Sequence, residues 1–216
     1  VGQQLDRGRA WVGLGSMRAS LGLEGRELVD AAVAEALGSI PGALDSHGLV
    51  AAWPGGRGQV GLTADALRFV VDAQEAGYTV DPKLRDQLVR TLKGALRSDY
   101  RYFLDGGSWL ERSQSLEALS AAGALEASYL TELADRTRYL GPRGTAHVLL
   151  AAEQGGRGDD GLSARLVESL DAEVVTALFQ GQERYQGLKS EGWRSPWINA
   201  SEALTLATVT RSLVGR

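Results

Sequence analysis

Apolar residues recur at helical spacing along most of this chain. Over residues 27–37 the sequence places Leu28, Ala31, Ala32 and Leu37 near one face. The same spacing returns over residues 63–76 and 81–96, where charged residues occupy the positions between the apolar ones. Because apolar residues three and four positions apart line one side of an α-helix, the pattern predicts three amphipathic helices in the first half of the chain.

Start and stop signals frame these helices. Thr63 stands where an N-cap is expected, and Gly77 stands where a helix would end. The pair Asp81-Pro82 predicts the opening of the next helix, since proline is favoured in the first helical position.

The second half of the chain continues the helical pattern. Helices are predicted over residues 113–122, 126–138, 143–152, 162–170, 173–179 and 200–214. The β-branched pair Val174-Val175 lies inside one of these stretches, and we assign it to a helix. Glycine turns separate the helices by a few residues to about a dozen, so neighbours should form helical hairpins. The fold class predicted is all-α, as a layered or closed array of hairpins.

Composition narrows the classes of function. Hydrophobic residues make up 44% of the 216 residues, which is typical of a folded globular protein, and no apolar stretch approaches membrane-spanning length. The net charge is -4 with both signs well mixed, which argues against binding to nucleic acid or to an anionic membrane surface, and no direct membrane insertion is expected. With no cysteine and two histidines, thiolate chemistry is excluded, and neither a metal nor a cofactor is expected. The first residues carry no signal-peptide pattern.

Several local candidates have plain structural interpretations. We expect His47 to lie in a loop and His147 to be a satisfied histidine in an apolar helix. The turn at Trp53 should connect two helices and be anchored by a buried indole. Asp159 and Asp160 sit in a glycine-rich loop that lacks the alternating oxygen ligands and distal Glu of a calcium loop.

One stretch carries a family resemblance. Ala52-Trp53-Pro54-Gly55-Gly56 is followed, from Leu62, by Leu-Thr-Ala-Asp-Ala-Leu-Arg-Phe-Val-Val-Asp-Ala-Gln-Glu-Ala-Gly-Tyr. It resembles the stretch of bacterial alpha-2-macroglobulins in which a glycine-rich turn with an aromatic leads into a helix that begins Thr-Ala and ends Ala-Gly-Tyr. Residues 139–152 and 192–213 fit the same template. The resemblance implies that residues 1–216 form one thioester-type domain, an α/α toroid, within a larger multi-domain protein.

The reactive motif of that family bears on mechanism. In the family a Cys-x-Glu-Gln motif near the start of the domain forms an internal thioester, and by counting, Val1, Gly2, Gln3 and Gln4 occupy that place here. Valine cannot form a thioester, so covalent capture of a protease would be impossible. Either the chain belongs to the branch without the thioester, or the sequence begins just beyond the motif; we favour the first.

The function implied by the resemblance is that of a non-catalytic domain in a broad-spectrum protease trap. Its partners would be the flanking macroglobulin-type β-sandwich domains and, through the parent chain, proteases, in the periplasm or cell envelope. Two alternatives stay open. Asp105-Gly106-Gly107-Ser108-Trp109 resembles the end of the triterpene cyclase repeat, and carbohydrate-active enzymes on this fold need two converging carboxylates, so an enzyme is one alternative. A plain interaction module is the other.

Overall fold

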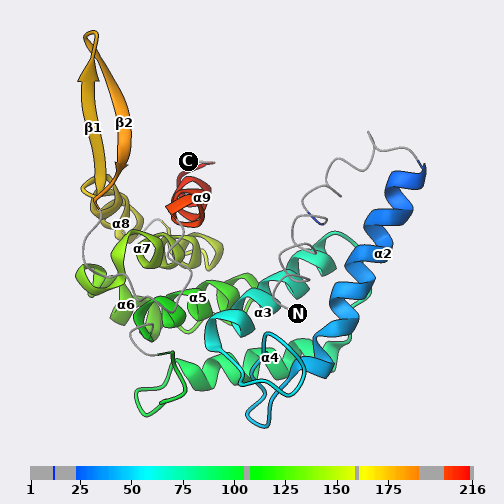
Figure 1. Cartoon of the computed structure of the whole chain (residues 1–216). Helices are drawn as coiled ribbons and strands as arrows, with labels where there is room; N and C mark the ends of the chain where they lie inside the picture. Colours follow the sequence, from blue (N-terminus) through cyan, green and yellow to red (C-terminus); the bar gives the residue numbers. More distant parts are fainter. Residues whose placement is uncertain (1–11, 13–22, 105–107, 159–160, 190–201, 215–216) are drawn as a thin grey trace.

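Helices make up most of the computed structural model, which describes residues 12, 23–104, 108–158, 161–189 and 202–214 (Figure 1). The helices are α2 (Leu23–Ser39), α3 (Val60–Glu75), α4 (Pro82–Ala95), α5 (Ser108–Ala121), α6 (Ala127–Ala134), α7 (Thr137–Gln154), α8 (Leu162–Asp171) and α9 (Glu202–Leu213), with a short 3-10 turn at Pro41–Ala43. The predicted helical fold class is confirmed in this part of the chain. None of the described helices is long and apolar enough to cross a membrane.

Helix α3 begins one turn earlier than its sequence predicts. Its N-cap is Gln59, and the predicted N-cap Thr63 is buried inside the first turn. The Thr63 hydroxyl donates to the Gln59 carbonyl at 2.7 Å and accepts the Val50 amide at 2.9 Å. The N-cap prediction is wrong because the preceding loop returns over the helix start and uses this hydroxyl as its acceptor.

The other predicted helix boundaries here are confirmed. Gly77 has a φ of +91°, and the amides of Gly77 and Tyr78 donate to the carbonyls of Gln74 and Ala73, each at 3.0 Å. This is the Schellman arrangement that glycine permits after a helix. Asp81 caps α4 by accepting the Lys83 amide at 2.9 Å.

The predicted helix over residues 126–138 is two helices, because α6 ends at Ala134 and α7 starts at Thr137. Helix α7 is itself kinked at Gly141, where φ is 63°, just before Pro142. Proline lacks the amide that continues a helix and disfavours helical geometry in the residue before it.

Residues 173–179, predicted as a helix, instead contribute a strand. Strand β1 (Val174–Phe179) pairs antiparallel with β2 (Gln182–Leu188), and the hairpin projects away from the helices in Figure 1. Gln180 and Gly181 join the strands with φ values of 51° and 76°. Two consecutive positive φ angles make the tight turn that matches strand twist, and β-branched residues favour strands, so local pairing overrides the helical spacing.

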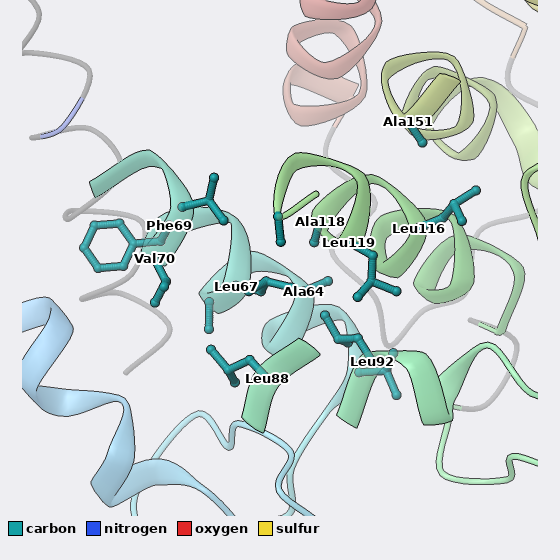
Figure 2. Packing of buried hydrophobic residues seen from close by; sticks show 14 of the residues in the cluster. Ala64, Leu67, Phe69, Val70, Leu88, Leu92, Leu116, Ala118, Leu119 and Ala151 are labelled. Carbon is teal, nitrogen blue, oxygen red and sulfur yellow. The ribbon is translucent and has the colours of Figure 1, made fainter. Parts of the chain in front are cut away.

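Helices α3 to α9 form two layers. The inner layer is α3, α5, α7 and α9, each of which packs against the next. The outer helices α4, α6 and α8 pack against members of the inner layer. Figure 2 shows the apolar core where Leu67 of α3, Leu88 and Leu92 of α4, and Leu119 of α5 converge. An α/α toroid requires such a layer of alternate helices, and closure into a ring remains a prediction.

Candidate functional site

Helix α5 lies in the middle of the inner layer, between α3 and α7 (Figure 1). Every residue from Glu111 to Ser120 is buried. The buried polar members are Glu111, Arg112, Ser113, Gln114, Ser115, Glu117 and Ser120. Burying polar groups is costly unless they are hydrogen-bonded, so their partners define what this helix can do.

Glu111 joins α5 to the start of α3. Its carboxylate accepts the Gly61 amide at 2.9 Å and the Leu104 amide at 2.8 Å. Burial raises the pKa of Glu111 above its ordinary value, although these amides act in the opposite direction. A methyl group on Gly61 would lie 2.9 Å from the Gln114 side-chain oxygen, so the end of that side chain would have to move to make room for it. The carboxylate acts as a cap for the N-terminus of a neighbouring helix.

Arg112 joins α5 to the two outer helices beside it. One guanidinium nitrogen donates to the Leu96 carbonyl at the end of α4 at 2.9 Å. The other lies 3.2 Å from a carboxylate oxygen of Glu132 on α6. The planar guanidinium can make both contacts at once, which fixes the angle between the helices.

Glu117 connects three helices of the inner layer. One carboxylate oxygen meets Nδ1 of His147 on α7, and the other accepts a hydrogen bond from the Arg211 guanidinium on α9. The Glu117 and His147 side chains are 5% and 9% exposed, whereas that of Arg211 is 41% exposed. Because Glu117 and His147 are both buried, we interpret the pair as structural. Through Arg211, Glu117 connects α9 to α5 and α7.

A second carboxylate organises the loop before α3. Asp45 accepts the amides of His47 and Leu49 at 2.8 Å and 3.0 Å, and the Gly58 amide at 3.0 Å. Burial alone would raise the pKa of Asp45, but the three amide donors outweigh it and hold the pKa below its ordinary value. A methyl group on Gly58 would lie 2.4 Å from Cβ of Leu49, so the loop closes only around a glycine.

The predicted thioester-motif positions Val1, Gly2, Gln3 and Gln4 lie outside the described residues, as do Asp105, Asp159 and Asp160. The notion of an altered thioester site therefore stays a prediction. Within the described ranges, no cluster of three or more His, Asp or Glu side chains could hold a metal ion.

The two histidines lie where they were expected, His47 in a loop and His147 in an apolar helix. His47 is exposed in the loop, where its ring lies 4.4 Å from that of Tyr102, and His147 is buried and bonded to Glu117. The expectation of a buried Trp53 is wrong, because its side chain is 65% exposed. The turn itself is present, with the Gly56 amide donating to the Trp53 carbonyl at 3.1 Å. The indole folds back over Gly56, which leaves it outside the core.

Sequence reasoning did not identify Glu111, Arg112 or Glu117 as important. Helix α5 was expected to start at Ser113, so the first two fell outside it. A signal was nevertheless present: α5 carries many polar residues and no amphipathic face, which is unusual for an ordinary surface helix.

Comparison with known proteins supports the fold. No family model and no curated protein sequence matches the chain. Among solved structures, Salmonella alpha-2-macroglobulin reacted with methylamine matches with a TM-score of 0.59 and 19% identity, over 71% of this chain and 10% of that one. Native Escherichia coli alpha-2-macroglobulin, from domain MG7 to the C-terminus, matches with a TM-score of 0.56 and 19% identity, over 68% of this chain and 23% of that one. The trypsin-activated Escherichia coli protein matches with a TM-score of 0.57 and 18% identity, over 68% of this chain and 10% of that one.

These matches establish a shared fold. The chain has the fold of a region within bacterial alpha-2-macroglobulins, and it spans between about a tenth and a quarter of the lengths of those chains. The resemblance found at Trp53–Tyr78 is thus confirmed at the level of the fold.

Proposed function

We propose that this chain is a non-catalytic domain of a bacterial alpha-2-macroglobulin-like protease inhibitor. The observation that supports this most is the agreement between the sequence resemblance around Trp53 and the fold similarity to three alpha-2-macroglobulin structures. Its partners would be flanking β-sandwich domains of a longer chain and, through that chain, proteases. The location would be the periplasm or the cell envelope.

The mechanism we propose is non-covalent. If Val1 occupies the place of the reactive cysteine, no thioester can form, and a protease would be held by enclosure after it cleaves the inhibitor. The domain would then act through its packing against neighbouring domains. The polar contacts of α5 suit such a role, because they hold five neighbouring elements in a fixed arrangement.

The alternative of an enzyme on the same fold has no specific observation in its favour. Glu117 and His147 form an acid–base pair, but their side chains are 5% and 9% exposed, and Arg211 of α9 contacts the same carboxylate. We infer that the pair is structural.

Inhibition is tested on a protein that contains this segment. The protein is mixed with a protease of broad specificity, and cleavage of a large protein substrate is compared with cleavage of a small peptide substrate. Enclosure predicts that hydrolysis of the large substrate is lost while hydrolysis of the small one persists. Equal loss of both, or no loss of either, contradicts the trap.

The absence of a thioester is tested separately by treating the same protein with methylamine and measuring its intact mass. No added amine and no covalent protease adduct are expected. An added amine would overturn the non-covalent mechanism and leave the inhibitor function standing, so the two failures are distinguishable.

A further inference from the structure

A stack of aromatic and cationic side chains lies where α5 and α7 begin. Trp109 in the first turn of α5 and Tyr139 in the first turn of α7 have ring centroids 5.8 Å apart and planes inclined by 16°. The guanidinium of Arg136 lies 5.2 Å from the Trp109 ring, and that of Arg138 lies 4.6 Å from the Tyr139 ring. We call these four residues the arginine–aromatic stack.

Among the described residues, no carboxylate compensates the charges of Arg136 and Arg138. Arg112 also contacts Trp109, at 5.6 Å, but it is paired with Glu132. Arg136 and Arg138 are exposed, and no carboxylate of the described residues pairs with either. The nearby Asp135 lies 3.8 Å from Arg165 instead. Two cations at one place with no carboxylate partner in the described part of the chain stand out, because the net charge of the chain is -4.

The stacking has a physical consequence for binding. A guanidinium held against a ring keeps its N–H groups available at its edge, and it has already lost much of the side-chain freedom that binding would otherwise cost. Carboxylates match the fork of donors that a guanidinium presents. The two cations contact different rings, so they offer two separated points of contact for carboxylates.

We propose that the arginine–aromatic stack is a docking surface for an acidic polypeptide segment, with Arg136 and Arg138 binding successive carboxylates. Exposed ion pairs contribute little binding free energy individually, so the contact is weak when the segment is free in solution. It is effective when the segment is held close by, since tethering raises its local concentration.

The test is a titration of the ¹⁵N-labelled chain with hexaglutamate at low ionic strength, followed by NMR chemical shifts. Shifts should be concentrated at Trp109, Arg136, Arg138 and Tyr139, and they should weaken as salt is added. The double variant Arg136→Gln and Arg138→Gln should bind about ten-fold more weakly. The matched control is Arg90→Gln with Arg101→Gln, which removes the same charge from two other exposed arginines and should leave the affinity within about two-fold.

Three outcomes overturn the proposal. Equal weakening in both double variants would mean that net charge alone attracts the peptide. If hexaglutamine binds as tightly as hexaglutamate, the carboxylates do not contribute to binding. Inorganic phosphate that shifts the same residues at equal or lower concentration would mean that the stack is a site for small anions.

Discussion

Helices α3 and α5 lie side by side in the inner layer, and both are buried, yet they are buried by different chemistry. Helix α3 contributes Leu67, Phe69, Val70 and other apolar residues to the core. Helix α5 buries Glu111, Arg112 and Glu117 together with Leu116 and Leu119. Apolar contacts are non-directional, so α3 is stabilised by the area it removes from water. The contacts of α5 are directional, and each one selects a particular atom on a particular neighbour.

This difference determines which substitutions each helix should tolerate. An apolar interface tolerates exchanges of similar volume, whereas a buried charge whose partner is removed destabilises strongly. We therefore expect α3 to be sensitive to lost volume and α5 to be sensitive to lost hydrogen bonds at constant volume.

Truncation on α3 should cost the most. Phe69 is fully buried, so Phe69→Ala is expected to lower the free energy of unfolding by about 4 kcal/mol, through lost transfer energy and the cavity left behind. Urea denaturation followed by circular dichroism measures it. As the matched control, Leu67→Met keeps the volume and should cost less than about 1.5 kcal/mol. If the two variants lose a similar free energy of unfolding, the core around α3 does not tolerate exchanges of similar volume, and the contrast with α5 fails.

Removal of the central carboxylate on α5 comes next. Glu117→Gln keeps the shape but takes the negative charge from between His147 and Arg211, and about 3 kcal/mol of stability should be lost. The same denaturation experiment checks it. If Glu117→Gln is neutral, the buried ion pairs do not carry the orientation of α5, and the contrast with α3 fails.

A smaller loss is expected at the contact between α5 and α3. Glu111→Gln has nearly the same volume, but one of the two oxygens that accept the Gly61 and Leu104 amides is replaced by an NH2 group, which donates and cannot accept. One buried amide is left without an acceptor, at a cost of about 2 kcal/mol. Equilibrium unfolding in urea gives the value. A cost below that of Leu67→Met would contradict the directional character assigned to α5.

Loss of the α9 attachment should be mainly local. Arg211→Ala is expected to lower global stability by about 1 kcal/mol, because its side chain is partly exposed, and to reduce amide-exchange protection in α9 more than elsewhere. Hydrogen exchange measured by mass spectrometry resolves the two effects. Thr210→Ala, an exposed neighbour on α9, is the control and should leave exchange unchanged. Uniform loss of protection across all helices would mean that α9 does not open independently.

The smallest effect concerns pH and separates Asp45 from Glu111. The folded-state pKa of Asp45 is held below its ordinary value of 3.8, so its contribution to stability is present above that value and is lost as pH falls through the folded-state pKa. The stability difference between the wild-type chain and Asp45→Asn, about 1 kcal/mol near neutral pH, should therefore shrink on acidification.

For Glu111 the sign is opposite. Burial raises its folded-state pKa, so its ionisation destabilises the fold as pH rises from the unfolded-state pKa through the folded-state one. Unfolding curves at a series of acidic pH values for wild type, Asp45→Asn and Glu111→Gln test both signs. Parallel curves for all three would show that neither carboxylate titrates differently on folding.

The sequence was a good guide wherever local signals decided the structure. The helix end at Gly77 and the helix start at Asp81-Pro82 were predicted from residue type, because only a few residues suit those backbone positions. The failures share a different cause. Thr63 looked like a cap, but its hydroxyl serves a loop amide thirteen residues earlier in the chain. The strand at Val174 depends on pairing with β2, which helical spacing does not reveal.

The candidate site was harder to predict than the fold. His147 could be assigned a structural role, but its partner Glu117 lies 30 residues away on another helix. The residue type of a glutamate favours exposure, so nothing local predicted that Glu111 and Glu117 would be buried. The prediction for Trp53 was wrong in the opposite sense, since a large apolar ring is usually buried and this one is exposed.

By itself, then, the sequence determined the helical class, most helix positions and the resemblance to one part of bacterial alpha-2-macroglobulins. Hydrophobic spacing and capping residues act within a few positions of the chain, so they can be read directly from it. Only the tertiary structure decided that α5 is central, which polar side chains it buries and that residues 174–188 form a hairpin. Those outcomes depend on groups brought together from distant positions, where the partner of a buried charge determines whether its burial is tolerated.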